Sequence, residues 1–193
     1  MHVVWYTAMA MDGRIADAAE SLDFLQSIGD RAGAEAEFPQ FLASVNAVVV
    51  GAGTVRWLLR GGHGWPHDDL PTWLISHDVD LVNRIGTTRA PLHRAEGDLA
   101  SVFRQIEDAG HARVWLAGGG SVAGQALALD RLDEVIVTIA PTALGAGPAL
   151  FDGPALPQRR SRVDSMAVQV SMARSTSAAV RVRNSVGVSI TLF

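Results

Sequence analysis

Residues 113–130 (RVWLAGGGSVAGQALALD) place an apolar strand, a glycine run and a helix of small residues in direct succession. The strand is predicted over Arg113–Ala117 and the helix over Gly120–Asp130, so the glycines lie at the turn between them. Backbone N–H groups at the start of a helix carry partial positive charge, and glycines leave these groups open to a ligand. The stretch therefore predicts an α/β unit whose turn suits a phosphate or pyrophosphate group.

The same turn partly matches a dinucleotide-binding pattern. Gly118, Gly120 and Ala123 satisfy G-x-G-x-x-A. A Rossmann unit also has an acidic residue about 20 positions further on, at the end of the next strand. Here Asp133 and Glu134 precede that strand instead. The turn is therefore either a phosphate-binding loop outside a standard Rossmann unit or a tight turn without a ligand.

Strands and helices alternate on both sides of this stretch, which is typical of an α/β fold. The predicted strands are His2–Met9, Val45–Val50, Thr72–Ser76 and Glu134–Ala140, and the predicted helices are Phe38–Ser44 and Asp98–Ala109. After Pro157 the apolar residues alternate, in segments 166–172, 180–183 and 188–193. We therefore expect a mainly parallel central sheet flanked by helices, with antiparallel strands at its C-terminal edge.

Length and charge limit the organisation and the partners of the chain. The 193 residues are the usual size of one domain and no linker divides them, so we expect a single domain over residues 1–193. The net charge is −4 without a basic cluster, so no nucleic-acid partner is expected. No apolar run is long enough to predict a membrane span. Residues 1–11 lack the charged start of a signal peptide, so we expect a cytoplasmic location.

The composition excludes several kinds of chemistry. The chain contains no cysteine and no lysine, so all 16 basic residues are arginine. Schiff-base lysines, phosphate-loop lysines, thiol nucleophiles, thiolate zinc sites and iron–sulfur clusters are therefore excluded. Chemistry by carboxylates, histidines, hydroxyls, backbone amides or a bound cofactor remains.

Two further segments directly follow predicted strands. Gly51-Ala52-Gly53-Thr54 comes after Val45–Val50, and residues 11–16 (MDGRIA), with an Asp-Gly turn, come soon after the first strand. The carboxyl ends of parallel strands share one edge of a sheet, and ligands of open α/β sheets bind there. The two glycine turns together predict a dinucleotide held across this edge, with its pyrophosphate touched from both sides.

The histidines do not predict a metal site. His63 and His67 have the spacing of a metal-binding pair on a helix, but Gly64 and Pro66 between them are incompatible with a helix that presents both. We therefore expect no metal, and we interpret both residues as histidines of a surface loop within Gly61–Pro71.

Four segments, in the expected order, resemble the dihydrofolate reductase-like superfamily, and within it the branch of the reductase domain of the bacterial riboflavin deaminase/reductase. They are residues 11–16 (MDGRIA), 50–54 (VGAGT), 117–121 (AGGGS) and 133–141 (DEVIVTIAP), the last followed by LGAG at 144–147. The likeness covers residues 1–183 and leaves 184–193 as a C-terminal extension. Residues 38–51 and 65–74 look closer to the stand-alone members of this branch.

The resemblance implies a NADPH-dependent reductase. Backbone groups at Ala8 and Ile15 are implied to hold the nicotinamide carboxamide. Other positions implied to contact the cofactor are Gly51, Gly53, Thr54, Ser76, His77, Gly118, Gly119, Gly120, Ser121 and Val122, and the family commonly has a cis bond where Gly118 meets Gly119. Thr138 matches a substrate-side hydroxyl, and Arg14 matches a position that binds a substrate phosphate.

Three residue types bear on the details of this likeness. Ala52 stands where a basic residue often grips the 2′-phosphate of NADPH, so the sequence leaves NADH open unless Arg56 or His77 substitutes. Arg14 replaces a frequent lysine, and an arginine fork binds anions with a different geometry. Hydride transfer must be matched by a proton. The candidate proton donors are Asp12 and Asp23.

Three functions are compatible with these residues. The first is a nicotinamide-dependent reductase of a small heterocycle, pteridine- or pyrimidine-like. The second is the riboflavin-pathway reductase of 5-amino-6-(ribosylamino)uracil 5′-phosphate, which needs a phosphate clamp. The third is a nucleotide-binding protein on the same scaffold without reductase activity. The resemblance and the alternating C-terminal segments, which would otherwise be open edges, also predict a homodimer.

Overall fold

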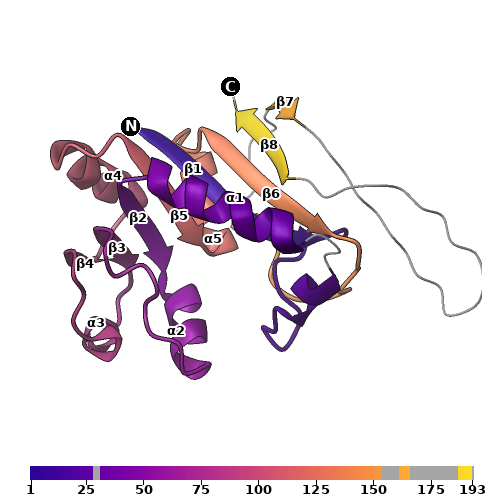
Figure 1. Ribbon diagram of the computed structural model, residues 1–193. Helices are drawn as coiled ribbons and strands as arrows, with labels where there is room; N and C mark the ends of the chain where they lie inside the picture. Colours follow the sequence, from indigo (N-terminus) through magenta and orange to yellow (C-terminus); the bar gives the residue numbers. More distant parts are fainter. Residues whose placement is uncertain (28–30, 154–160, 166–186, 193) are drawn as a thin grey trace, which may run out of the picture.

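The carboxyl ends of six strands lie at the same edge of one sheet, because all six run parallel (Figure 1). The computed structural model describes residues 1–27, 31–153, 161–165 and 187–192. The parallel strands are β1 (His2–Ala10), β2 (Ala47–Gly51), β3 (Thr72–Ile75), β4 (Leu92–Ala95), β5 (Arg113–Gly118) and β6 (Glu134–Ala140). Their order across the sheet is β4-β3-β2-β5-β1-β6. Beyond β6, β8 (Gly187–Leu192) pairs antiparallel with β6, and β7 (Ser161–Ser165) pairs antiparallel with β8.

Helices cover both faces of the parallel sheet. One face carries α4 (Leu99–Asp108) and α5 (Gly120–Ala128), and the other carries α1 (Arg31–Ser44), α2 (Ala52–Arg60) and the short α3 (Asp80–Ile85). A 3-10 helix, η1, covers Asp23–Ser27. Among the described residues, no helix is long and apolar enough to cross a membrane.

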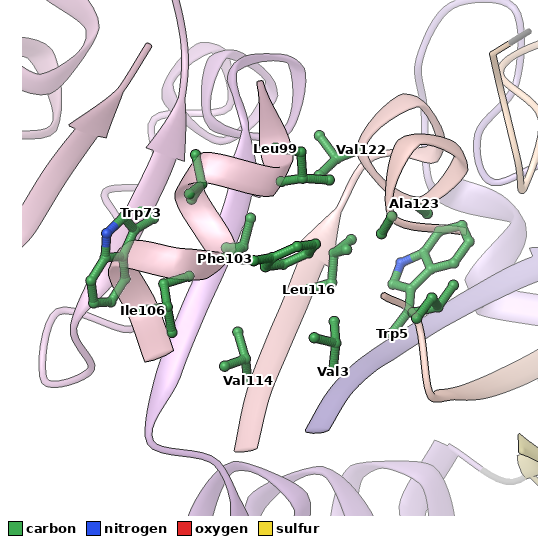
Figure 2. Packing of buried hydrophobic residues seen from close by; sticks show 14 of the residues in the cluster. Val3, Trp5, Trp73, Leu99, Phe103, Ile106, Val114, Leu116, Val122 and Ala123 are labelled. Carbon is green, nitrogen blue, oxygen red and sulfur yellow. The ribbon is translucent and has the colours of Figure 1, made fainter. Parts of the chain in front are cut away.

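The core is double because the central strands are apolar on both faces, as expected for strands buried between two helical layers. On the α4 side, the fully buried Phe103 and Ile106 pack with Val3 and Leu116 in one cluster. Figure 2 shows Phe103 and Ile106 pointing from α4 toward the strands that carry Val3 and Leu116. The spacing of Leu99, Val102, Phe103 and Ile106 places all four on the buried face of α4. Asp98 caps this helix by accepting the backbone N–H of Ser101 at 2.8 Å.

His67 corrects the interpretation of the loop histidines. Its ring is half-buried and lies 4.8 Å, centroid to centroid, from the ring of Trp115 and 5.4 Å from that of Trp65. Phe38 of α1 packs against the same His67 and Trp115 rings. Burial among these rings lowers the pKa of His67 below its usual value, although Asp69 opposes the shift. His67 is therefore part of an aromatic cluster under α1, whereas His63 is exposed.

The α/β class and the parallel sheet flanked by helices are confirmed. The bounds of β6 equal the predicted Glu134–Ala140, and β1, β2, β3 and β5 differ from prediction by one or two residues at an end. Helices α2 and α3 and strand β4 were not predicted from the sequence, and α1 begins at Arg31 instead of Phe38. The predicted edge strands 166–172 and 180–183 lie outside the described residues, so the C-terminal arrangement that they imply stays a prediction.

Candidate functional site

Two helices begin side by side at the carboxyl edge of the sheet. Helix α2 follows β2 directly with Gly51 as its N-cap, and α5 follows β5 with Gly119 as its N-cap. Neither N-cap makes a side-chain hydrogen bond to its helix. The first N–H groups of a helix lack partners within it, so both helices present open donors and a positive dipole end. Since β2 and β5 are neighbours, the two positive ends are brought together.

The junction between these helices has no room for side chains. A β-carbon on Gly51 would lie 3.0 Å from a methyl group of Val122 and 3.4 Å from the carbonyl oxygen of Gly118. Gly118 has a φ of +135°, and a β-carbon there would lie 2.7 Å from the hydroxyl oxygen of Thr54. The Gly118–Gly119 peptide bond is cis, as the family resemblance implies. The sequence therefore needs glycine at these positions to hold the two helix starts in contact.

A cavity of about 500 Å³ lies at this junction. It contains the glycine turns of both helices, the middle of β1, the end of β3, and parts of two loops. Its lining residues are Trp5, Thr7, Ile15, Ala16, Glu20, Leu22, Gly51, Ala52, Gly53, Thr54, Trp57, Ile75, Ala117, Gly118, Gly119, Gly120, Ser121, Val122, Gln125, Pro148 and Asp152. The structure thus brings together nine of the predicted cofactor positions: Ile15, Gly51, Gly53, Thr54, Gly118, Gly119, Gly120, Ser121 and Val122.

Asp12 holds a distant loop instead of lining this cavity. Its carboxylate accepts the backbone N–H of Gly145 at 2.7 Å and that of Leu144 at 3.0 Å. These bonds, that from Gly145 most of all, lower the pKa of Asp12 below its usual value. An exposed carboxyl group with a lowered pKa is ionised at neutral pH and has no proton to give. The placement favours a structural role over that of proton donor.

Arg14 contributes to the same attachment. Its guanidinium donates to the carbonyl oxygen of Gly147 at 2.7 Å, and its backbone pairs with that of Ala149. A β-carbon on Gly147, which has a φ of +118°, would collide with the backbone of Ala16 and Asp17. We call residues 12–16 together with 144–150 the clasp. The clasp explains why MDGRIA and LGAG occur in one chain: each segment supplies the other's hydrogen-bond partners.

The clasp positions one wall of the cavity. The backbone N–H of Ile15 donates to the carbonyl oxygen of Pro148 at 3.0 Å, and both residues line the cavity. Leu150 N–H donates to the carbonyl oxygen of Gly13 at 2.8 Å, closing the other side of the clasp. Asp12 and Arg14 do not line the cavity themselves, and they therefore act on it through Ile15 and Pro148, which the clasp holds in place.

A second loop reaches across the cavity to α2. The indole N–H of Trp57 donates to the carbonyl oxygen of Glu20 at 2.8 Å, and the Glu20 carboxylate pairs with Arg60. The loop is folded on Asp17, whose side chain accepts the N–H groups of Ala19 and Ser21 at 2.8 Å each. Glu20 and Trp57 both line the cavity. The sequence offered no motif for this contact, since its partners come from an irregular loop and an unpredicted helix.

A smaller cavity of about 190 Å³ adjoins the first and shares Ala52 and Ile75 with it. Ser76 and His77 line it, as do Arg56 and Asp78. Ser76 is buried, and its hydroxyl oxygen accepts the backbone N–H of Asp78 at 3.0 Å. Ser76 and His77, two further predicted cofactor contacts, thus lie together beyond β3, beside the main cavity.

Three predicted residues lie outside both cavities, in addition to Asp12 and Arg14. Ala8 pairs with Thr138 across β1 and β6, and because side chains alternate along a strand, Ala8 faces away from the cavity-lining Thr7. Asp23 is exposed at the start of η1. The acidic residues that do line the main cavity, among the described residues, are Glu20 and Asp152, and neither was predicted from the sequence.

Comparisons with known proteins bear on the family and the fold. The model of the RibD C-terminal domain family matches residues 1–176. Uncharacterized protein YwjB of Bacillus subtilis (strain 168) is 27% identical over 151 residues, which cover 77% of this chain and 81% of that protein. A crystal structure from Shewanella sp. PV-4, provisionally assigned to riboflavin biosynthesis, has a TM-score of 0.75 at 21% identity, with 100% of this chain and 99% of the other covered.

Two more solved structures share the fold. A pyrimidine reductase-like protein of Corynebacterium diphtheriae has a TM-score of 0.67 at 17% identity, with 100% of this chain and 92% of the other covered. A diaminohydroxyphosphoribosylaminopyrimidine deaminase/5-amino-6-(5-phosphoribosylamino)uracil reductase of Thermotoga maritima has a TM-score of 0.57 at 16% identity, and the match covers 56% of that chain. The family model spans the whole of the parallel sheet and of the cavity lining. This chain belongs to the RibD C-terminal domain family.

Proposed function

We propose that this protein is a NADPH-dependent oxidoreductase that transfers a hydride to a small heterocyclic substrate, pteridine- or pyrimidine-like. The observation that carries the proposal is the pair of helix N-termini, without side-chain caps, that meet at the cavity of about 500 Å³. Family membership supports the reaction type, since the fold relatives include proteins named as reductases.

The residues present fit a dinucleotide. A pyrophosphate needs several N–H donors close together and no side chain in the way. The junction supplies both, because β-carbons on Gly51 and Gly118 would fill the space between α2 and α5. Backbone groups at Gly53, Thr54, Gly120 and Ser121 would hold the phosphates, with no lysine needed. Ile15 and its clasp would form the wall beside the nicotinamide, on the β1 side of the cavity.

When bound, a reduced nicotinamide supplies a hydride to a C=N or C=O carbon of the substrate, and a proton completes the reduction. The chain's part is to orient both partners and to bring that proton. Glu20 is committed to an ion pair with Arg60. Asp152 lines the same cavity beside the start of α5, where its backbone N–H donates to the carbonyl oxygen of Gly120 at 3.1 Å. We propose a water molecule oriented by Asp152 as the proton source in place of Asp12 and Asp23.

A second candidate is the riboflavin-pathway reduction of 5-amino-6-(ribosylamino)uracil 5′-phosphate, favoured by the names of the fold relatives. It requires a cation for the substrate phosphate. The nominated residue, Arg14, donates to the carbonyl oxygen of Gly147 and is committed to the clasp. This contact favours a substrate without a phosphate, which is why the first proposal ranks above the second. Thr138 remains the proposed substrate-side hydroxyl, with the backbone of its pairing partner Ala8 beside it.

Turnover decides between these functions. We expect oxidation of NADPH, followed by its absorbance, with a dihydropteridine or pyrimidine substrate and little with the ribosylamino-pyrimidine phosphate. Preferred turnover of the phosphate compound would establish the second candidate instead. NADPH binding without oxidation by any member of a substrate panel would indicate a nucleotide-binding protein without reductase activity.

Three wider properties belong to the same proposal. We propose that residues 1–193 act as one domain, that the protein is a cytoplasmic enzyme without a nucleic-acid or membrane partner, and that it forms a homodimer. Light scattering tests the dimer directly. A mass of about twice the 20.5 kDa of the chain is expected, and a mass equal to the single chain would contradict it.

A further inference from the structure

The two cavities lie on opposite sides of the helix starts that follow β2 and β5, so each cavity can receive one half of a dinucleotide. The helix starts that follow β2 and β5 lie at the middle of the strand order β4-β3-β2-β5-β1-β6. A pyrophosphate held there leaves one nucleoside to extend toward β1 and β6 and the other toward β3 and β4. The main cavity covers the β1 side, through Thr7 and Ile15. The smaller cavity, lined by residues that follow β2, β3 and β4, lies on the other side.

The smaller cavity contains a charge pair. The guanidinium of Arg56 donates to the carboxylate of Asp78, with 3.2 Å between Nη2 and Oδ2. The other carboxylate oxygen of Asp78 accepts the backbone N–H of Asp80 at 3.1 Å. The side chains are partly buried, with 43% of Arg56 and 31% of Asp78 exposed. A volume of about 190 Å³ suits one corner of a ribose with its substituents rather than a whole nucleoside.

Resting on the proposed function, we infer that the Arg56–Asp78 ion pair sets the choice between NADPH and NADH. These cofactors differ by one phosphate on the adenosine ribose. Arg56 attracts that phosphate, and Asp78 repels it while accepting a hydroxyl hydrogen bond when the phosphate is absent. Because the two opposite charges are partly exposed, the ion pair makes this chain's discrimination between the two cofactors weak, within about tenfold.

The geometry leaves Arg56 able to serve both partners. A guanidinium has five N–H donors in a planar fork, and the bond to Asp78 uses one of them. Arg56 can therefore keep its carboxylate partner and still donate to a phosphate. Ala52, one turn earlier on α2 and shared by both cavities, brings no charge. Among the described residues of this cavity, Arg56 is the only arginine.

Substitutions of Arg56 and of Asp78 must then change the ratio of NADPH affinity to NADH affinity in opposite directions. Asp78→Asn removes the negative charge and leaves Arg56 in place, so we expect the ratio of NADPH affinity to NADH affinity to rise by about tenfold. Arg56→Gln removes the cation and leaves the carboxylate, so the same ratio is expected to fall by about tenfold. Both effects should shrink at high salt, since the pair is partly exposed.

The experiment measures Kd by calorimetry for NADPH and NADH, and for the fragments 2′,5′-ADP and 5′-AMP, with the wild type and both variants. The fragments report the adenosine side alone and do not depend on reduction. Matched controls are Arg89→Gln and Asp68→Asn, because Arg89 and Asp68 form an exposed ion pair that lines neither cavity. The controls should leave every ratio within twofold of the wild type.

The outcomes separate the inference from the proposed function. Failure of the wild type to bind either cofactor would overturn the proposed function. Binding of both cofactors with affinity ratios unchanged in Asp78→Asn and Arg56→Gln would overturn only the inference about the ion pair. A variant that is merely destabilised weakens NADPH and NADH equally, so the ratio remains a valid readout. Opposite shifts of the ratio in the two variants, repeated with the fragments, would support the inference.

Discussion

The hydroxyl oxygen of Thr54 stands 2.7 Å from the point where a β-carbon of Gly118 would lie. Thr54 belongs to the first turn of α2, and Gly118 ends β5 just before α5. The contact is possible only because residue 118 has no side chain. It brings two helix starts to one side of the cavity, and the proposed pyrophosphate site depends on it.

Gly118→Ala tests this contact. The added methyl group would overlap the Thr54 hydroxyl at a φ of +135°, which L residues rarely adopt, so the two helix starts must move apart. We expect a loss of about 1–3 kcal/mol in the free energy of unfolding and loss of dinucleotide binding. Chemical denaturation and calorimetry measure the two effects. Gly64→Ala is the matched control, since its β-carbon would meet no atom within 4 Å. Unimpaired binding by Gly118→Ala would show that the helix starts are not the binding site.

Asp12→Asn tests the clasp. The carboxylate of Asp12 binds two backbone N–H groups, so its pKa is lower in the folded protein than the usual value of about 3.9. This bond contributes stability that is fully present above the unfolded pKa and lost as the pH falls through the folded pKa. We expect Asp12→Asn to be less stable at neutral pH and to lose this part of the acid dependence, measured by denaturant unfolding from pH 2 to pH 7.

Turnover distinguishes the clasp from a catalytic Asp12. Loss of a proton donor lowers kcat by about 10²–10⁴-fold, whereas a weakened clasp changes KM more than kcat. Asp108→Asn, at the exposed end of α4, is the control that changes charge alone. A collapse of kcat in Asp12→Asn with unaltered stability would restore Asp12 to the role of proton donor.

His67 makes the aromatic cluster sensitive to acid. Its pKa is lowered by burial, so the unfolded chain takes up a proton at a higher pH than the folded protein does. The free energy of unfolding should therefore decline as the pH falls below about 6.5 toward the folded pKa of His67. His67→Phe keeps a ring against Trp115 and should remove this part of the decline. The exposed His63→Phe should retain it. Equal pH profiles for the wild type and His67→Phe would contradict this assignment.

Trp57→Phe tests the loop that reaches across the cavity. The substitution keeps an aromatic ring but removes the N–H that binds the carbonyl oxygen of Glu20. We expect a loss of about 1 kcal/mol in stability and faster dissociation of NADPH, followed by stopped-flow fluorescence. Trp73→Phe, buried on the α4 side of the sheet and outside both cavities, should leave the dissociation rate unchanged.

The parts of the fold that local pattern determines were predictable. The apolar run Glu134–Ala140 and the helix capped by Asp98 have strong signals in their own residues. Helix α2 was missed because Gly53 in its first turn disfavours a helix by propensity, and the close approach of its start to Gly118 and Val122 is not visible in the local sequence. Pro39 lies inside α1, and because proline disfavours the interior of a helix, the sequence did not predict that α1 extends to the residues before it.

The site divides in the same way. The glycine turns were found because glycine at a strand-to-helix junction has a local physical reason. The roles of Asp12 and Arg14 could not be predicted, because their partners Gly145 and Gly147 lie more than a hundred residues further along the chain. A carboxylate in a turn motif looks the same in sequence whether it gives a proton or accepts backbone N–H groups.

Thermal unfolding of the wild type with increasing NADPH, and with NADH in parallel, tests the dinucleotide site most directly. At a free ligand concentration of 1,000 times Kd, binding to the folded state contributes about 4 kcal/mol. For a domain of this size that raises Tm by about 8–16 °C. The account predicts a rise that grows with the logarithm of ligand concentration for both cofactors. A Tm that stays constant up to millimolar NADPH and NADH would contradict it.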